Sequence, residues 1–281
     1  MVKELLKPNE ILQIPGYAKV RILFQTHAIF IPEDIIYVNS SLAQETGNIF
    51  RTGQRNIIYM ENNPFDQNIR WFHEGYLKYK SFTKGFAYMS FIQNENKPPN
   101  EGELDEYAMQ IGSLCLDVLG NQRSNLEMKG LLYFWTVYNV FDRILAAGID
   151  IDLVHEKGLP DPKSEYLRSK ITGLVGYKAY YQALQEETEI RNRMIAGDLS
   201  KLVANANKRK RPINIFVLLG RSHHQLAGLF PDYCRHISKS QIAQRPVLPE
   251  ALVLLHEKLA KKEEATEEEW YDAMMAEIQL Y

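Results

Sequence analysis

Two short apolar runs constrain the fold of this chain more than any other feature of its sequence. Residues 57–60 read Ile-Ile-Tyr-Met, and residues 213–219 read Ile-Asn-Ile-Phe-Val-Leu-Leu. Runs rich in β-branched and aromatic residues indicate β-strands, and strands that are apolar at successive positions are buried on both faces. Such strands are typical of a parallel sheet that helices cover on each side. The sequence therefore predicts an α/β fold.

Two further strands and several helices complete the expected sheet. One strand is expected at 19–24, and another at 148–154, where two aspartates interrupt the apolar pattern. Strands that alternate with helices imply crossover connections, so we expect a central, largely parallel sheet of about four or more strands, flanked by helices. Apolar residues recur three or four positions apart, as on one face of a helix, in the stretches 35–49, 105–119, 125–147 and 164–206.

The chain is expected to form a single domain, residues 1–281. Its 45% apolar content supplies enough material for a full core. A large helical insert, about 94–207, is expected between the second and the last core strand. Near the C-terminus, Thr266 and Glu269 match the pattern of a capping box ahead of an apolar stripe. We expect a helix at about 266–280 that docks on the body of the protein or on a second copy of the chain.

Composition excludes several classes of function. The 33 basic and 35 acidic residues give a formal net charge of −2, which provides no long-range attraction to nucleic acid or to an anionic membrane. No run of about 18 apolar residues and no signal-peptide pattern is present, so the expected location is the cytoplasm. Cys115 and Cys234 stand outside any zinc-binding spacing and are expected to be reduced thiols. The sequence has no phosphate loop, dinucleotide-binding motif or zinc-protease helix motif.

Chemically useful side chains follow three of the expected strands. His27 comes shortly after the first strand, Glu61 comes directly after the second, and His223 comes shortly after the last. Because the carboxyl ends of parallel strands meet at one edge of a sheet, these residues are expected to converge on one crevice. Two imidazoles and a carboxylate can move protons to and from a water molecule, and they can also bind a divalent metal.

The order of these motifs carries a resemblance to a known family. The chain has Phe-Gln-Thr-His at 24–27, Tyr-Met-Glu at 59–61, Glu-Ile-Arg-Asn at 189–192 and Gly-Arg-Ser-His at 220–223. This order resembles the TraB/TIKI-like family, within the superfamily that includes erythromycin esterase and the ChaN haem-binding proteins. Its members share a Gly-x-x-His after the first strand, a glutamate after the second, an arginine on a late helix and a second Gly-x-x-His. The resemblance spans about residues 19–230.

The resemblance implies a hydrolase-like enzyme that acts on a peptide or on a small-molecule ester. His27 or His223 would activate water, and Glu61 would orient the proton or shuttle it. Arg191 would stabilise developing negative charge. In the peptidase branch a divalent ion, Mn, Co or Zn, would bind His27, Glu61 and His223. The esterase branch implies no metal.

A noncatalytic protein that binds a small molecule or haem in the same crevice is the alternative. Phe24 stands where the family has a glycine, and a glycine there would allow a positive φ or a close approach of the backbone. The exchange makes credible a binding protein that keeps the crevice but has lost its catalytic chemistry. A third alternative is an interaction protein that uses the helical stretch and the C-terminal helix, through which the chain would also form a homo-oligomer.

Three further patterns suggest other sites. The Gly-Arg-Ser-His-His segment partly resembles a nucleophile elbow but lacks the closing glycine, so Ser222 is not expected to be a nucleophile. Asp150, Asp152 and His155 could supply metal ligands, although a turn-forming acidic pair is the commoner explanation. The basic run 208–211 directly precedes a strand, which favours a solvated loop over a nucleic-acid site.

Overall fold

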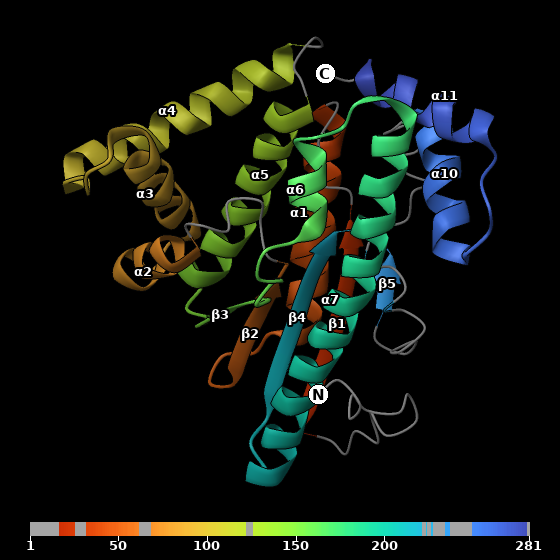
Figure 1. Cartoon of the computed structure of the whole chain (residues 1–281). Coiled ribbons are helices and arrows are strands. Elements are labelled where there is room, and N and C mark those ends of the chain that lie inside the picture. Colours follow the sequence, from red (N-terminus) through yellow and green to blue (C-terminus); the bar gives the residue numbers. More distant parts are fainter. Residues whose placement is uncertain are drawn as a thin grey trace.

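The structure, a computed structural model, describes residues 17–25, 32–61, 69–121, 126–220, 223, 226, 234–236 and 249–279. Its centre is one sheet with the strand order β3-β2-β4-β1-β5 (Figure 1). All neighbouring strands run parallel. The expected α/β fold with a central parallel sheet is confirmed, and β1, β2 and β4 are neighbours. The strands are β1 (Ala18–Gln25), β2 (Arg55–Met60), β3 (Asp152–His155), β4 (Ile213–Gly220) and β5 (Cys234–His236).

Strand β4 forms the centre of the sheet. All eight of its residues are buried, as the apolar run at 213–219 predicts. It pairs along its whole length with β1, and it pairs with β2 as far as Met60, which lies beside Leu218. The carboxyl ends of β2 and β4 therefore lie side by side.

Helices flank this sheet and connect its strands. The helices expected at 35–49, 105–119 and 125–147 correspond to α1, α4 and α5. Helices α2, α3 and α10 are additions to the predicted elements. The helices are α1 (Pro32–Ile49), α2 (Ile69–Tyr79), α3 (Phe82–Glu95), α4 (Glu101–Gly120), α5 (Leu126–Ala146), α6 (Lys163–Arg168), α7 (Gly173–Arg209), α10 (Glu250–Lys261) and α11 (Glu267–Ile278).

The stretch between β2 and β4 is largely helical, but it also supplies a strand. The helical periodicity at 164–206 corresponds to two helices. Helix α6 ends at Arg168, and α7 begins at Gly173, whose positive φ of 73° turns the chain. Strand β3 lies inside the stretch 94–207 and pairs with β2. This part of the chain therefore contributes to the central sheet as well as to its helical cover.

The two faces of the sheet are covered by different helices. In Figure 1, α7 crosses in front of the sheet, and α1 and α5 lie behind it. Successive residues of a strand point to opposite faces. In β2 and β4 the odd-numbered apolar residues pack on α7, and the even-numbered apolar residues pack on the α1 and α5 side. The residues of α7 that belong to this cluster or pack against it are Ile195, Ala196, Leu199, Leu202, Val203 and Ala206.

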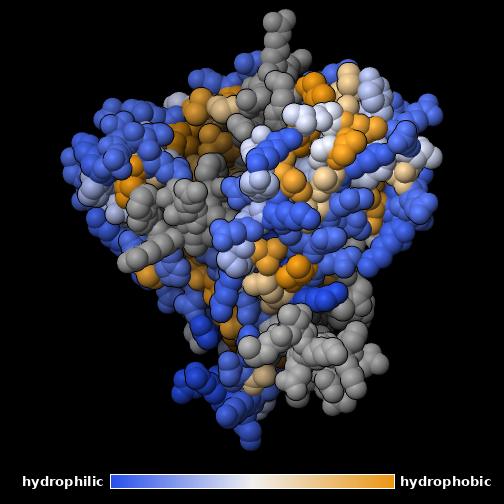
Figure 2. All heavy atoms as spheres, in the orientation of Figure 1, coloured by the Kyte–Doolittle hydropathy of each residue, from blue (hydrophilic) through white to orange (hydrophobic). Residues whose placement is uncertain are grey.

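Helices α10 and α11 pack on the N-terminal half of α7. Thr266 and Glu269 form a capping box at the start of α11, where each side chain accepts from the other residue's backbone N–H. Apolar side chains of both helices also reach the surface, and Figure 2 shows them among hydrophilic ones on the upper right. None of the helices in the described ranges is long and apolar enough to cross a membrane. The shared cluster contains Tyr177, Tyr181, Leu252, Leu255, Trp270, Ala273 and Met274.

Candidate functional site

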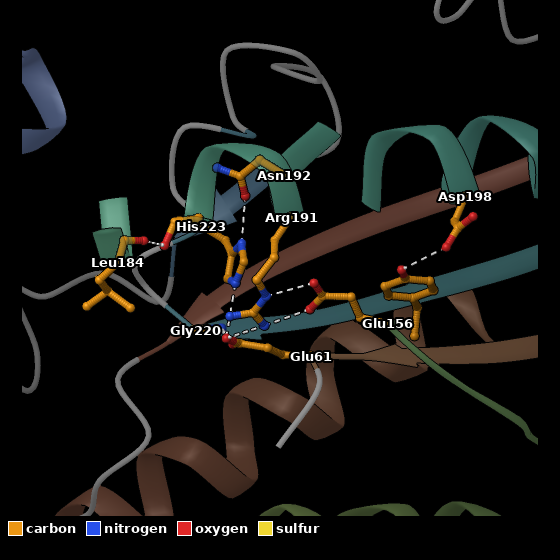
Figure 3. A network of polar contacts seen from close by, with 10 residues as sticks. Glu61, Glu156, Leu184, Arg191, Asn192, Asp198, Gly220 and His223 are labelled. Atoms are coloured by element: carbon orange, nitrogen blue, oxygen red, sulfur yellow. Dashed lines mark hydrogen bonds and ion pairs between the residues drawn. The ribbon is translucent and has the colours of Figure 1, made fainter. Parts of the chain in front are cut away.

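The carboxyl ends of β2, β3 and β4 meet beside the middle of α7, and a group of charged residues lies there (Figure 3). Glu61 directly follows β2. Its backbone N–H donates to the carbonyl oxygen of Leu218 (3.1 Å), which keeps Glu61 in line with the strand. Tyr59 faces α7, so the alternation of side chains aims Glu61 at the same face. Glu61 therefore points toward Arg191 and Asn192 of α7.

His223 follows β4 and joins Glu61 to α7. Its Nε2 lies 3.0 Å from Oε1 of Glu61, and its Nδ1 lies 2.6 Å from Oδ1 of Asn192. The side chain is fully buried. An imidazole that is engaged at both nitrogens and shielded from solvent cannot also reach a substrate. In this arrangement His223 fixes the position of the Glu61 carboxylate.

Arg191 is the positive charge at the centre of the group. Its Nη2 lies 3.1 Å from Oε1 of Glu61 and 2.7 Å from Oε2 of Glu156, and its Nε lies 2.8 Å from Oε1 of Glu156. Burial alone would lower the pKa of the guanidinium. The hydrogen bonds and the negative charges of Glu156 and Glu61 outweigh burial and raise that pKa. Arg191 therefore stays charged between the two carboxylates.

Glu156 and Asn192 are the members of the group that the sequence did not reveal. Glu156 directly follows β3, just as Glu61 follows β2, and its backbone N–H donates to the carbonyl oxygen of Met60 (2.9 Å). Val154 packs toward α7, so the alternation along β3 aims Glu156 there as well. If the strand had been predicted to end at 155 rather than at 154, Glu156 would have been the residue directly after it. This second glutamate would then have joined the candidate site.

Three donors in the described part of the structure contact the Glu61 carboxylate. These are Nη2 of Arg191, Nε2 of His223 and the backbone N–H of Gly220, which donates to Oε2. The side chains of Glu61 and Arg191 are 16% and 20% exposed, whereas those of His223 and Glu156 are 0% exposed. A ligand at this edge of the sheet can thus reach Glu61 and Arg191, and it cannot reach His223.

The structure brings together three of the four predicted site residues: Glu61, Arg191 and His223. The fourth, His27, lies outside the described residues, as does Ser222. Their predicted roles therefore stay predictions.

The second set of metal ligands suggested by the sequence is not assembled. His155 points to the face opposite Glu156, and its ring lies 5.7 Å from that of Phe72, edge to face. Neither ring nitrogen has a hydrogen-bond partner, and burial, together with the charge of His73, lowers the pKa of His155 to about 4. Asp152 is more than half exposed and pairs with Arg55 instead (2.7 Å). The imidazole of His155 and the carboxylate of Asp152 therefore lie in different surroundings.

The donor set does not fit a divalent metal shared by Glu61 and His223. Nε2 of His223 faces the Glu61 carboxylate itself, and the guanidinium of Arg191 already supplies a positive charge 3.1 Å from Oε1. A cation beside Oε1 would have to displace both contacts. Within the described ranges, no group of three or more His, Cys, Asp and Glu side chains is arranged to hold a metal ion.

Comparisons with known proteins do not assign the chain to a family. No family model matches it, and searches of curated proteins and of solved structures return no significant match.

Proposed function

We propose that this chain is a hydrolase in which Glu61 and Arg191 bind and polarise an attacking water at the carboxyl edge of the sheet. The observation that carries the proposal is the 3.1 Å contact between Nη2 of Arg191 and Oε1 of Glu61, made by the two partly exposed members of a network that is otherwise buried. A fixed carboxylate can accept a proton, and a fixed guanidinium can stabilise negative charge.

The shape of the guanidinium defines where that water would bind. Its five N–H bonds form a rigid planar fork. Nε and Nη2 are directed at Glu156, and Nη2 also contacts Glu61. No partner for Nη1 is found in the described part of the structure. An N–H of Nη1 runs parallel to the N–H directed at Glu61, so an oxygen that accepts from Nη1 lies beside Oε1, about 3 Å from it.

This placement gives a balanced reaction. Glu61 accepts a proton from the water while the water oxygen attacks the carbonyl carbon of an ester or a peptide bond. The second N–H of Arg191 Nη1 donates to the carbonyl oxygen as it becomes negative. When the tetrahedral intermediate collapses, Glu61 returns the proton to the departing alcohol or amine. His27 enters this scheme as an additional proton carrier, on the strength of the sequence pattern alone.

A noncatalytic small-molecule binding protein is the second candidate. It is favoured by the mutual pairing of Glu61, Glu156, Arg191 and His223, since a self-satisfied network of this kind also suits a rigid binding wall. Haem suits this candidate less well than a polar ligand, because His223 would have to give up Asn192 or Glu61 to coordinate iron.

A panel of p-nitrophenyl esters and fluorogenic peptides separates the two candidates. The wild-type protein is assayed with EDTA and with added Mn, Co or Zn, beside Arg191→Met and a control, Glu189→Gln, which lies on the same helix and pairs with Lys262. We expect turnover that survives EDTA, is lost in Arg191→Met and is kept in the control. Turnover that requires added metal would favour the metal-dependent branch. A wild-type protein that hydrolyses nothing would favour the binding protein.

A further inference from the structure

We propose that Glu156 is a positioning residue that fixes the orientation of the Arg191 guanidinium on which turnover depends. The proposal rests on the proposed function and adds to it a residue outside every motif in the sequence. Glu156 does not reach the exposed edge of the site, because its side chain is 0% exposed. It acts through Arg191.

The contacts of Glu156 define the plane of the guanidinium. Its two oxygens lie 2.8 Å from Nε and 2.7 Å from Nη2 of Arg191, a paired arrangement that removes rotation about the last bonds of the arginine. The backbone of Glu156 is itself fixed, because its N–H donates to Met60, the residue before Glu61. Through Glu156, the backbone of β2, which leads into Glu61, therefore fixes the plane of the Arg191 guanidinium.

Arg191 Nη2 is shared between the two glutamates. It lies 2.7 Å from Glu156 and 3.1 Å from Glu61. Without its contacts to Glu156, the guanidinium could rotate and donate to Glu61 from both Nη1 and Nη2. A single carboxylate prefers this paired arrangement. Nη1 would then be occupied by Glu61 and would no longer be available to a water or to a carbonyl oxygen. By binding Nε and Nη2, Glu156 therefore keeps Nη1 available to a water or to a carbonyl oxygen.

The substitutions Glu156→Gln and Glu156→Asp disturb this hold in different ways. Glutamine keeps the length but replaces one acceptor with a donor that faces the N–H groups of Arg191. Aspartate keeps the charge but is one methylene shorter, so it cannot hold Nε and Nη2 from the same backbone position. A displacement of about 1 Å at a catalytic group costs on the order of a hundredfold in rate. We expect kcat to fall about a hundredfold in Glu156→Gln and less in Glu156→Asp, with KM changed little.

The decisive experiment is a double-mutant cycle on kcat for p-nitrophenyl acetate, using wild type, Glu156→Gln, Arg191→Lys and the double variant. If Glu156 acts through Arg191, Glu156→Gln has no further effect on kcat in the Arg191→Lys background. A role limited to folding would multiply the two effects or leave kcat unchanged, and either result overturns the proposal. The control is Asp152→Asn, which removes an exposed carboxylate from β3, the strand that Glu156 follows, and should keep wild-type kcat.

A second readout is independent of turnover. The paired contact with Glu156 should protect the Arg191 Nε–H from exchange with solvent, so its ¹⁵N-edited NMR signal should persist in wild type and in Glu61→Gln and disappear in Glu156→Gln. If the wild-type protein hydrolyses nothing but this pattern holds, the hydrolase proposal fails and Glu156 still positions Arg191 for binding. If the signal is unprotected in wild type, the positioning role itself is overturned.

Discussion

Glu61 and His223, which are 162 residues apart in the sequence, meet through a 3.0 Å contact between Oε1 and Nε2. Parallel strands bring them together, because β2 and β4 are hydrogen-bonded neighbours that end at the same edge. The other ring nitrogen contacts Asn192 on α7, so one imidazole connects the sheet to the helix that covers it. The contact of His223 with Asn192 and its contact with Glu61 can be tested separately.

The first prediction concerns His223 and Asn192. Replacing His223 by Ala leaves buried polar groups of Asn192 and Glu61 without their partner, which we expect to lower the free energy of unfolding by about 2–4 kcal/mol. Urea unfolding of His223→Ala, Asn192→Ala and the double variant measures the coupling of the pair. We expect a coupling free energy of about 1 kcal/mol or more. Additive losses would show that the 2.6 Å contact contributes nothing.

His155 gives a prediction about acid stability. Its pKa is lowered to about 4, from 6.5 for an exposed histidine, by burial and by His73. Between pH 6.5 and 4 the unfolded chain therefore takes up a proton that the folded protein does not, and the free energy of unfolding falls by up to about 3 kcal/mol as the pH drops. His155→Phe keeps an aromatic ring against Phe72 and should remove this component.

Urea unfolding of wild type and His155→Phe at pH 7 and at pH 4.5 measures this difference. The difference between the two proteins in this loss of stability measures the contribution of His155. His73→Ala is the control, because it removes only the neighbouring charge and should keep most of the pH dependence. An equal loss of stability in wild type and His155→Phe would refute the prediction.

Gly85 lies at a close approach between α2 and α3. A Cβ at this position would lie 3.0 Å from the backbone nitrogen of Tyr76, and one at Gly75 would lie 3.1 Å from the Cα of Gly85. Gly85→Ala should therefore separate the helices and lower the melting temperature. Gly197→Ala in α7 meets nothing within 4 Å, so it should raise stability by about 0.5–1 kcal/mol. A stabilised Gly85→Ala, measured by thermal unfolding, would contradict this close approach.

Asp142 of α5 caps the start of α3. Its carboxylate accepts from the backbone N–H groups of Phe82 (2.6 Å) and Thr83 (3.1 Å) and from the hydroxyl of Ser81 (3.0 Å). Asp142→Asn replaces one acceptor by a donor and removes the charge, so we expect a loss of about 1–3 kcal/mol in urea unfolding. At the start of α4 the exposed side chain of Glu103 accepts from the backbone N–H of Asn100, and Glu103→Gln should cost clearly less. Equal losses would mean that burial does not strengthen the cap.

The parallel sheet and the meeting of its strand ends follow from the sequence. Continuous apolar runs mark strands that are covered on both faces, and the residue that ends such a run lies at the edge where ligands bind. That reasoning locates Glu61 and His223 without knowledge of the helices. The prediction of Arg191 depended on the family resemblance, because an arginine among glutamates on a long helix would equally suit a surface ion pair.

The remaining parts depend on tertiary contacts. Strand β3 is short and begins with an exposed aspartate, so its end, and with it Glu156, could not be fixed from the pattern. Helices α2 and α3 contain glycines that ordinarily weaken helices, yet Gly75 and Gly85 are what permit the two helices to pack closely. Asn192 resembles any polar residue of an amphipathic helix until His223 is placed beside it.

The ratio of kcat between wild type and Glu61→Gln tests the central role of this carboxylate most directly. Glutamine keeps the size of the side chain and removes the proton acceptor, so circular dichroism should show the same fold in both proteins. With the ester or peptide that wild type hydrolyses fastest, and with EDTA present, we predict that kcat falls by about a hundredfold or more in Glu61→Gln. A folded Glu61→Gln protein that retains wild-type kcat would show that Glu61 does not accept the proton.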